Sequence, residues 1–96
     1  MAIASLPAGA ASLLGDHTCA QWMGMEASQK VLWADSFLAP LSLTIKSLHR
    51  EKHDPYNDDS KSSGNAVAFI DDYCTRHPER VAADGAGEYF KILMNQ

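Results

Sequence analysis

The order of apolar and polar positions predicts helices along the chain and no strand. Its clearest signal is a series of apolar side chains at alternating steps of three and four, which is the spacing of one helical face. These positions are Val31, Ala34, Leu38, Leu41, Ile45 and Leu48. They predict a long central helix from about Ser28 to His49. Pro40 lies inside it and lacks a backbone N–H, so it should kink the helix or split it near residues 36–37.

A short helix is expected before the central one. Asp16 or Thr18 can cap it, because both side chains can accept a hydrogen bond from a free backbone N–H of a first helical turn. Cys19 and Trp22 then share one face, three residues apart, and Gly24 ends or kinks the helix.

Residues 49–65 form a long polar segment and are expected to be a surface loop, with Pro55 and a Ser-Ser-Gly run as turn signals. The acidic cluster in this segment lacks the alternating order of a calcium loop, so a solvated loop is the better interpretation. His49 and His53 are four positions apart, but no third ligand is spaced to help them hold a metal. No metal site is predicted.

A further helix is predicted from an Asn65 cap through His77, with Cys74 on its apolar face. Asp71 and Asp72 are expected to point outward from it. Adjacent helical residues diverge by about 100°, so this pair does not converge as a general acid and base must.

The last predicted helix runs from about Pro78 to Met94, because proline is well tolerated at a first helical position. Its packed positions are expected to be Val81, Ala82, Gly85, Ala86, Tyr89, Phe90 and Leu93. Gly85 and Gly87 lower helix propensity and allow a neighbour to approach closely.

The chain of 96 residues therefore predicts one small all-α domain of three or four helices, residues 16–96. Residues 1–15 are apolar and rich in alanine and glycine, and are expected to be a flexible segment. They lack the basic region of a complete signal peptide, so a signal-peptide remnant and a natural tail both remain open. The segment is also too short, and too broken by Pro7, for a transmembrane helix.

Charge and missing motifs narrow the classes of function. The formal net charge is −4, from 12 acidic and 8 basic side chains, so nucleic acid and anionic membrane surfaces would be repelled. The chain has no glycine-rich phosphate loop, no G-x-S-x-G elbow and no H-E-x-x-H motif. A protein that binds other proteins, with no catalytic residue and no cofactor, is predicted.

Cys19 and Cys74 are the only two cysteines, and they lack the spacing of a zinc site or a redox motif. A disulfide between them is favoured, since small domains in oxidising compartments often need one, while two buried free thiols are the alternative. Such a bond would close most of the domain and contribute about 4 kcal/mol in the chain-entropy account.

One broad apolar surface is a candidate for binding a client or partner. It consists of Trp33, Phe37, Leu38 and Leu41 on the central helix. Apolar helical stripes usually form the core, so these residues would be a binding surface only where they are part-exposed.

Taken together, Thr18-Cys19 followed by Trp22, a long apolar helix, a polar loop, the Ile70 to Cys74 segment and a final helix resemble the HdeA/HdeB-like family of small periplasmic proteins. The resemblance covers about residues 16–93. It implies a four-helix domain with a signal peptide, a periplasmic or secreted location, and one disulfide between Cys19 and Cys74. Well-known members are acid-stress chaperones, which are dimers at neutral pH and open in acid to hold denatured clients. The resemblance therefore implies protein clients and a homodimer.

A second hypothesis is a periplasmic immunity or inhibitor protein that neutralises one toxin or hydrolase. Such proteins are also small, acidic, helical and tied by a disulfide. The two hypotheses differ in pH: an immunity protein binds one partner tightly at neutral pH, whereas an acid chaperone binds many proteins only in acid.

Overall fold

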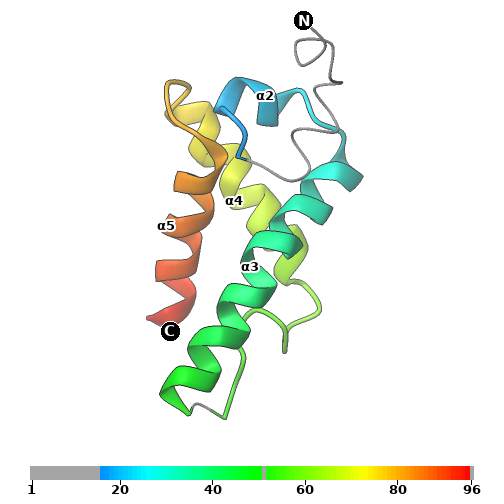
Figure 1. The fold of residues 1–96 in the computed structure, drawn as a ribbon. Helices are drawn as coiled ribbons and strands as arrows, with labels where there is room; N and C mark the ends of the chain where they lie inside the picture. The colour runs from blue at the N-terminus through cyan, green and yellow to red at the C-terminus, as the bar shows by residue number, and fades with distance from the viewer. Residues whose placement is uncertain (1–15, 51, 96) are drawn as a thin grey trace, which may run out of the picture.

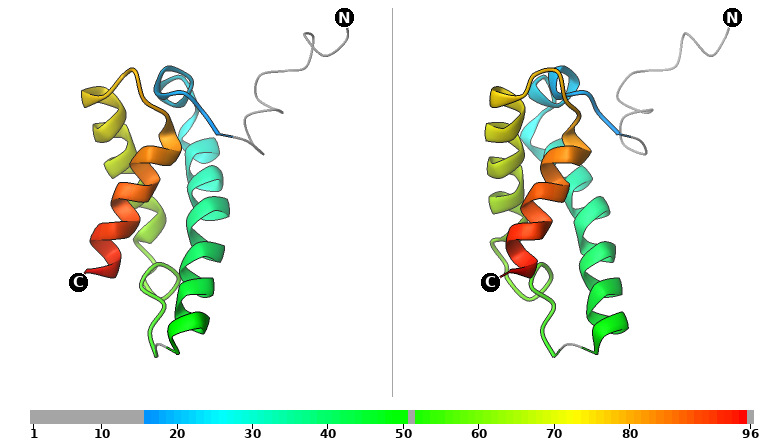
Figure 2. Two further views of the ribbon diagram at one scale, coloured as in Figure 1. Left: turned by 60° about the vertical axis from the view of Figure 1, so that its left-hand side comes forward. Right: turned by 90° about the vertical axis from the view of Figure 1, so that its left-hand side faces the viewer.

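The computed structural model describes residues 16–50 and 52–95, which form four helices and no strand. The helices are α2 (Cys19–Met23), α3 (Ala27–His49), α4 (Ser62–Arg76) and α5 (Ala82–Met94). α3, α4 and α5 lie lengthwise beside one another, and short α2 lies across one end of this bundle (Figures 1 and 2). The all-α prediction is confirmed for the described residues. The expectation about residues 1–15 lies outside them.

The first helix is set by its caps. The Thr18 hydroxyl accepts a hydrogen bond from the backbone N–H of Gln21 at 3.1 Å, and the Gln21 side chain accepts one from the Thr18 N–H at 2.9 Å. This reciprocal pair is a capping box. Thr18 is therefore the cap rather than Asp16, and α2 ends at Gly24 as predicted.

The central helix is continuous from Ala27 to His49 with Pro40 inside it. The alternative of a split helix is therefore wrong, and a kink at Pro40 stays a prediction. A proline removes one backbone donor from a helix but leaves the remaining hydrogen bonds in place. In a helix of 23 residues those bonds, and the packing of the helix, keep the two halves joined.

The buried face of α3 is rotated from the predicted stripe. Its buried residues are Lys30, Trp33, Ala34, Leu38 and Ser42. Leu48, expected on the packed face, is 71% exposed, because the last turn of α3 extends beyond the end of α5 (Figure 2). Periodicity identified the helix, but the positions of α4 and α5 decided which face is covered.

The polar segment is shorter and less exposed than predicted. α4 begins at Ser62, so Asn65 lies inside the helix instead of capping it. Asp54 and Tyr56 in the loop are buried, at 4% and 3% exposure. A purely solvated surface loop is therefore the wrong description, and the loop is a packed part of the fold.

The last helix begins at Ala82 rather than Pro78. Val81, just before the helix, is extended and forms an isolated antiparallel bridge with Thr18: the Cys19 N–H donates to the Arg80 carbonyl at 2.9 Å, and the Ala82 N–H donates to the His17 carbonyl at 2.7 Å. This pairing satisfies main-chain groups outside a helix, so the helix is delayed.

The packed face of α5 is largely as predicted. Its buried residues are Ala82, Gly85, Ala86, Tyr89 and Leu93. A Cβ at Gly85 would lie 3.0 Å from Cδ1 of Tyr73, so the glycine does allow close approach of α4. At Gly87 a Cβ would meet nothing within 4 Å, so the same prediction is wrong for that residue.

Candidate functional site

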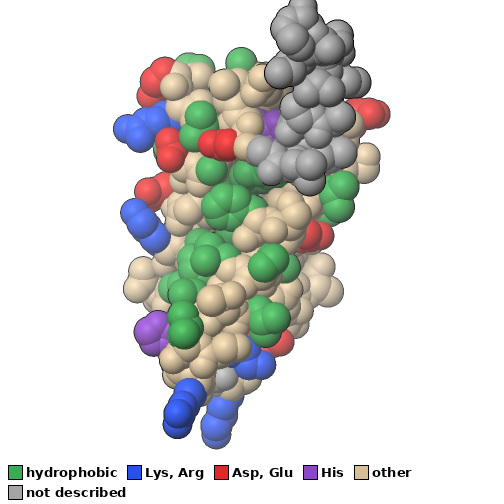
Figure 3. Space-filling model, viewed as in Figure 1, with side chains coloured by type: hydrophobic (Ala, Val, Ile, Leu, Met, Phe, Trp, Pro, Cys, Tyr) green, Lys and Arg blue, Asp and Glu red, His purple; other side chains and the backbone are tan. Residues whose placement is uncertain are grey.

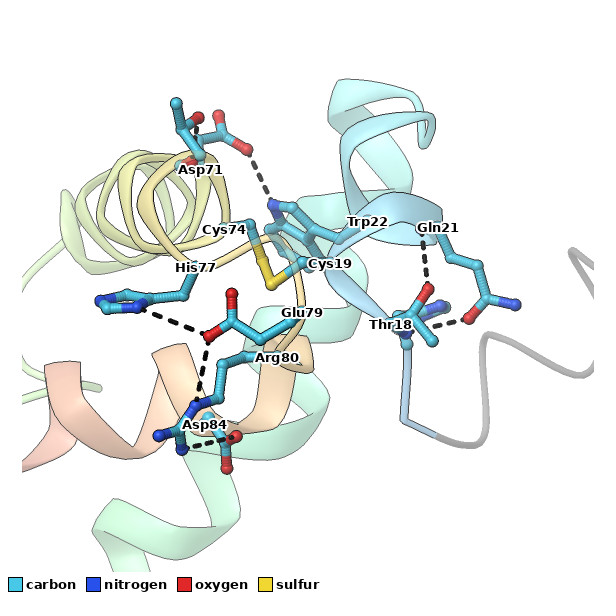
Figure 4. Close-up of a disulfide and its surroundings, with 12 residues drawn as sticks. Thr18, Cys19, Gln21, Trp22, Asp71, Cys74, His77, Glu79, Arg80 and Asp84 are labelled. Carbon is cyan, nitrogen blue, oxygen red and sulfur yellow. Dashed lines mark hydrogen bonds and ion pairs between the residues drawn. A yellow bond between two sulfur atoms is a disulfide. The ribbon is translucent and has the colours of Figure 1, made fainter.

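Cys19 and Cys74 form a disulfide that joins α2 to α4 (Figure 4). Their Cα atoms are 4.9 Å apart, and both residues are buried. The alternative of two free thiols is wrong. The bond fixes one end of the bundle, and the residues one helical turn from each cysteine are brought next to each other.

Trp22, Lys30 and Asp71 meet beside the disulfide. The Trp22 indole N–H and the Lys30 ammonium both donate to Oδ1 of Asp71 at 2.8 Å, and the ammonium lies 5.6 Å from the centre of the indole ring. Trp22 is fully buried and the Lys30 side chain is 11% exposed. Asp71 was predicted to point outward from α4. Instead, its carboxylate connects α4 to α2 and α3. Asp72 does lie at the surface, paired with Arg76 at 2.6 Å.

The four residues predicted as a binding surface all lie on α3 and differ in burial. Trp33 and Leu38 are buried in the core, while Phe37 and Leu41 are partly buried. The Trp33 ring lies 5.4 Å from the Trp22 ring and 5.3 Å from the Phe37 ring, measured between centroids. Because Trp22 of α2 packs on Trp33, binding of a client to Trp33 would require α2 to move away from α3.

Asp35 joins α3 to the loop and to the first turn of α4. The Tyr56 hydroxyl and the Ser63 hydroxyl each donate to its Oδ1 at 2.7 Å. Burial, together with the Asp35 carboxylate, raises the pKa of the Tyr56 phenol well above its ordinary value. The phenol therefore stays protonated, and remains a donor to Asp35, well above neutral pH.

Asp54 fixes the loop against the second half of α3. Its carboxylate accepts a short hydrogen bond from the Ser42 hydroxyl and one from the Asn57 side-chain amide at 2.8 Å. Burial acts to raise the pKa of Asp54, but these hydrogen bonds, one from the Asn57 N–H and the charge of Lys46 outweigh it, so the pKa lies below its ordinary value of 3.8. The folded structure therefore favours the ionised form.

His17 lies in the core beside the two tryptophans. It is fully buried, and neither ring nitrogen has a hydrogen-bond partner. Its ring centroid is 5.6 Å from that of Trp33 and 6.4 Å from that of Trp22. Burial lowers the pKa of His17 below its ordinary 6.5, although neighbouring Asp16 opposes the change. The folded state therefore resists protonation of this imidazole.

Aspartates accept most of the side-chain hydrogen bonds between separate elements in the described part of the chain. We call Asp16, Asp35, Asp54 and Asp71 the junction aspartates. Asp16 completes the set by accepting from the Ala83 N–H, at the start of α5, at 3.1 Å. Other ion pairs, such as Arg80 with Asp84 at 3.7 Å (Figure 4), lie within one short stretch at the surface and contribute little.

The sequence contained a usable signal for one junction aspartate. Trp22 follows Cys19 by three residues, and Asp71 precedes Cys74 by three, so a disulfide between the cysteines places the two side chains together. Asp54 and Tyr56 had no such signal, because their burial depends on how a loop folds over α3. The polar composition of the loop suggested the opposite.

Among residues 16–50 and 52–95, no three His, Cys, Asp or Glu side chains lie close enough to hold a metal ion. In the same residues, no helix has both the length and the apolar character needed to cross a bilayer. Comparison with protein-family models, curated proteins and solved structures found no match to the chain. The geometry of the site therefore carries the functional argument.

Proposed function

We propose that this protein is an acid-activated holding chaperone of the HdeA/HdeB-like type, located in the periplasm or secreted, without enzymatic activity. Its clients would be proteins denatured by acid. Apolar helix faces would bind them, with Trp33, Phe37, Leu38 and Leu41 as the central group. At neutral pH the proposed form is closed, as a homodimer.

The observation that carries this proposal is the set of junction aspartates. Carboxylates lose their charge in strong acid, and a protonated carboxyl is a weaker acceptor than a carboxylate. Loss of the Asp71 charge also leaves the Lys30 ammonium largely buried without its counter-ion, which is strongly unfavourable. Acid thus weakens the contacts of α4 with α2 and α3, and those of α3 with the loop, together.

The pKa changes of His17 and Asp54 both lower the stability of the fold in acid. The pKa of His17 is lowered, so the stability from its neutral, buried form is complete above 6.5 and is lost as the pH falls below that value. The pKa of Asp54 is also lowered, so its contribution is complete above 3.8 and is lost below it. The disulfide survives acid and would keep the loosened chain compact.

Aggregation of an acid-denatured client, followed by light scattering, tests this function. Suppression is expected at about pH 2–3 and not at neutral pH. No suppression at either pH would contradict the proposal. Tight binding of a single toxin or hydrolase at neutral pH, by a chain that stays folded in acid, would favour the immunity hypothesis instead.

Lys30→Met provides a sharper variant. It removes the cation that acid leaves unpaired, so the pH at which suppression begins should fall by about half a unit or more. Lys91→Met is the matched control, since Lys91 makes only an exposed pair with Glu88 at 3.2 Å. A lower onset in both variants would show that net charge, and not the buried cation, sets the response. Size-exclusion chromatography at both pH values tests the homodimer.

A further inference from the structure

A hollow of about 510 Å³ lies at the end of the bundle opposite the disulfide. It is lined by Ser42, Ile45, Lys46, His49, His53, Pro55, Leu93 and Met94. Four of these residues follow one face of α3 at steps of three, one and three. The others come from the loop and the end of α5. The hollow has the size of a small-molecule site, which typically measures about 300–1,000 Å³.

The hollow exists because the helices differ in length. α3 has 23 residues and α5 has 13. α5 ends at Met94 and does not extend beside the last turns of α3 (Figure 2). The loop returns along α3 and contributes His53 and Pro55 as one wall. The hollow is therefore lined by three separate segments and is partly open to solvent.

The lining separates into an apolar part and a basic part. Ile45, Pro55, Leu93 and Met94 provide the apolar surface, and methionine adapts its shape to different ligands. Lys46, His49 and His53 provide the basic groups, and both histidines are exposed. None of the described residues that line the hollow is acidic. An apolar surface beside one lysine ammonium and two imidazoles, all of them able to donate hydrogen bonds, favours an amphiphilic anion.

The nearest buried carboxylate does not cancel this preference. Asp54 lies close enough to Lys46 for the lysine to lower its pKa. However, its oxygens already accept from Ser42 and from two groups of Asn57. Basic side chains also gather at this end of the molecule, below the apolar surface (Figure 3). In the sequence, the adjoining residues 50–52 carry two basic side chains and one acidic one, Arg50, Lys52 and Glu51, so their net charge is positive.

We propose that this hollow binds a small amphiphilic carboxylate, with its acyl chain against Ile45, Leu93 and Met94 and its carboxylate at Lys46, His49 and His53. This site is separate from the residues assigned to clients, Trp33, Phe37, Leu38 and Leu41, and does not depend on the chaperone proposal. It uses no residue of the disulfide end.

Decanoate, below its critical micelle concentration, is the probe. Isothermal titration calorimetry with the intact protein at about pH 7 should show one decanoate per chain, with decanol and decyltrimethylammonium each at least about tenfold weaker. Affinity should rise about twofold to fourfold per methylene from hexanoate to decanoate. Chemical shifts of the amides at His49, His53 and Leu93 should move during the titration. No binding, or equal binding of the cationic probe, would overturn the proposal.

The double variant His49→Gln with His53→Gln should weaken decanoate about tenfold, while circular dichroism shows an unchanged fold. Lys52→Gln is the control, because it removes a charge from the same end without removing a lining residue. It should change affinity less than about twofold. An equal loss in both variants would contradict a specific carboxylate site.

Discussion

The two ends of the bundle are held by different kinds of interaction. At the disulfide end, α2 is bonded covalently to α4 and residues 17–19 pair with residues 80–82. At the opposite end, which we call the loop end, α3 is held mainly by Asp54 and by the packing of Tyr56. Covalent and main-chain contacts survive acid, whereas a carboxylate contact does not. The loop end should therefore open when the pH falls, while at the disulfide end α3 loosens and α2 stays bonded to α4.

Loss of the disulfide is expected to have the largest effect on this difference. Cys19→Ser with Cys74→Ser should lower the free energy of unfolding by about 4 kcal/mol, because the open chain regains the entropy of a long loop. Urea unfolding of the variant and of the wild type, followed by circular dichroism, measures the loss. An unchanged midpoint would mean that the bond is not what stabilises this end.

The next largest effect is expected at the carboxylate beside the disulfide. Asp71→Asn removes the counter-ion of Lys30 and should cost about 2 kcal/mol at neutral pH, less than for a fully buried pair because Asp71 is partly exposed. Asp72→Asn, which affects only the exposed pair with Arg76, should cost less than about 0.5 kcal/mol. Similar midpoints of the two variants in thermal unfolding would show that Lys30 does not need Asp71 as its counter-ion.

Asp54 tests the acid response of the loop end. Asp54→Asn should destabilise the protein by about 1–2 kcal/mol at neutral pH, because the hydrogen bonds from Ser42 and Asn57 lose a charged acceptor. Its pKa is lowered in the fold, so the difference from wild type should shrink as the pH falls below 3.8 and vanish in strong acid. Chemical denaturation at a series of pH values measures it. A constant difference would contradict the assigned role.

The smallest effects are expected at the glycines of α5. Gly85→Ala should cost about 1 kcal/mol despite the better helix propensity of alanine, since its Cβ would lie 3.0 Å from Cδ1 of Tyr73. Gly87→Ala meets no atom within 4 Å and should stabilise by about 0.5–1 kcal/mol. Opposite shifts in melting temperature are expected. Two stabilising substitutions would show that Tyr73 moves freely, and that the packing of α4 on α5 is looser than it appears.

The sequence by itself determined the helical class and most helix boundaries, and it favoured the disulfide over two free thiols. These features depend on local signals: apolar spacing in α3, the Thr18 cap, Gly24, and two cysteines on apolar faces. Local signals are strong because they act between residues within one or two turns. The packed positions of α5 were predictable for the same reason.

Only the tertiary structure decided which polar groups are buried. Asp71, Asp54, Tyr56 and His17 belong to polar or mixed stretches, and their burial depends on segments far away in the chain. The rotated face of α3 and the hollow at its end likewise follow from where α5 stops. Helix periodicity fixes which side chains share a face, but the free energy of burying that face depends on the partner that covers it.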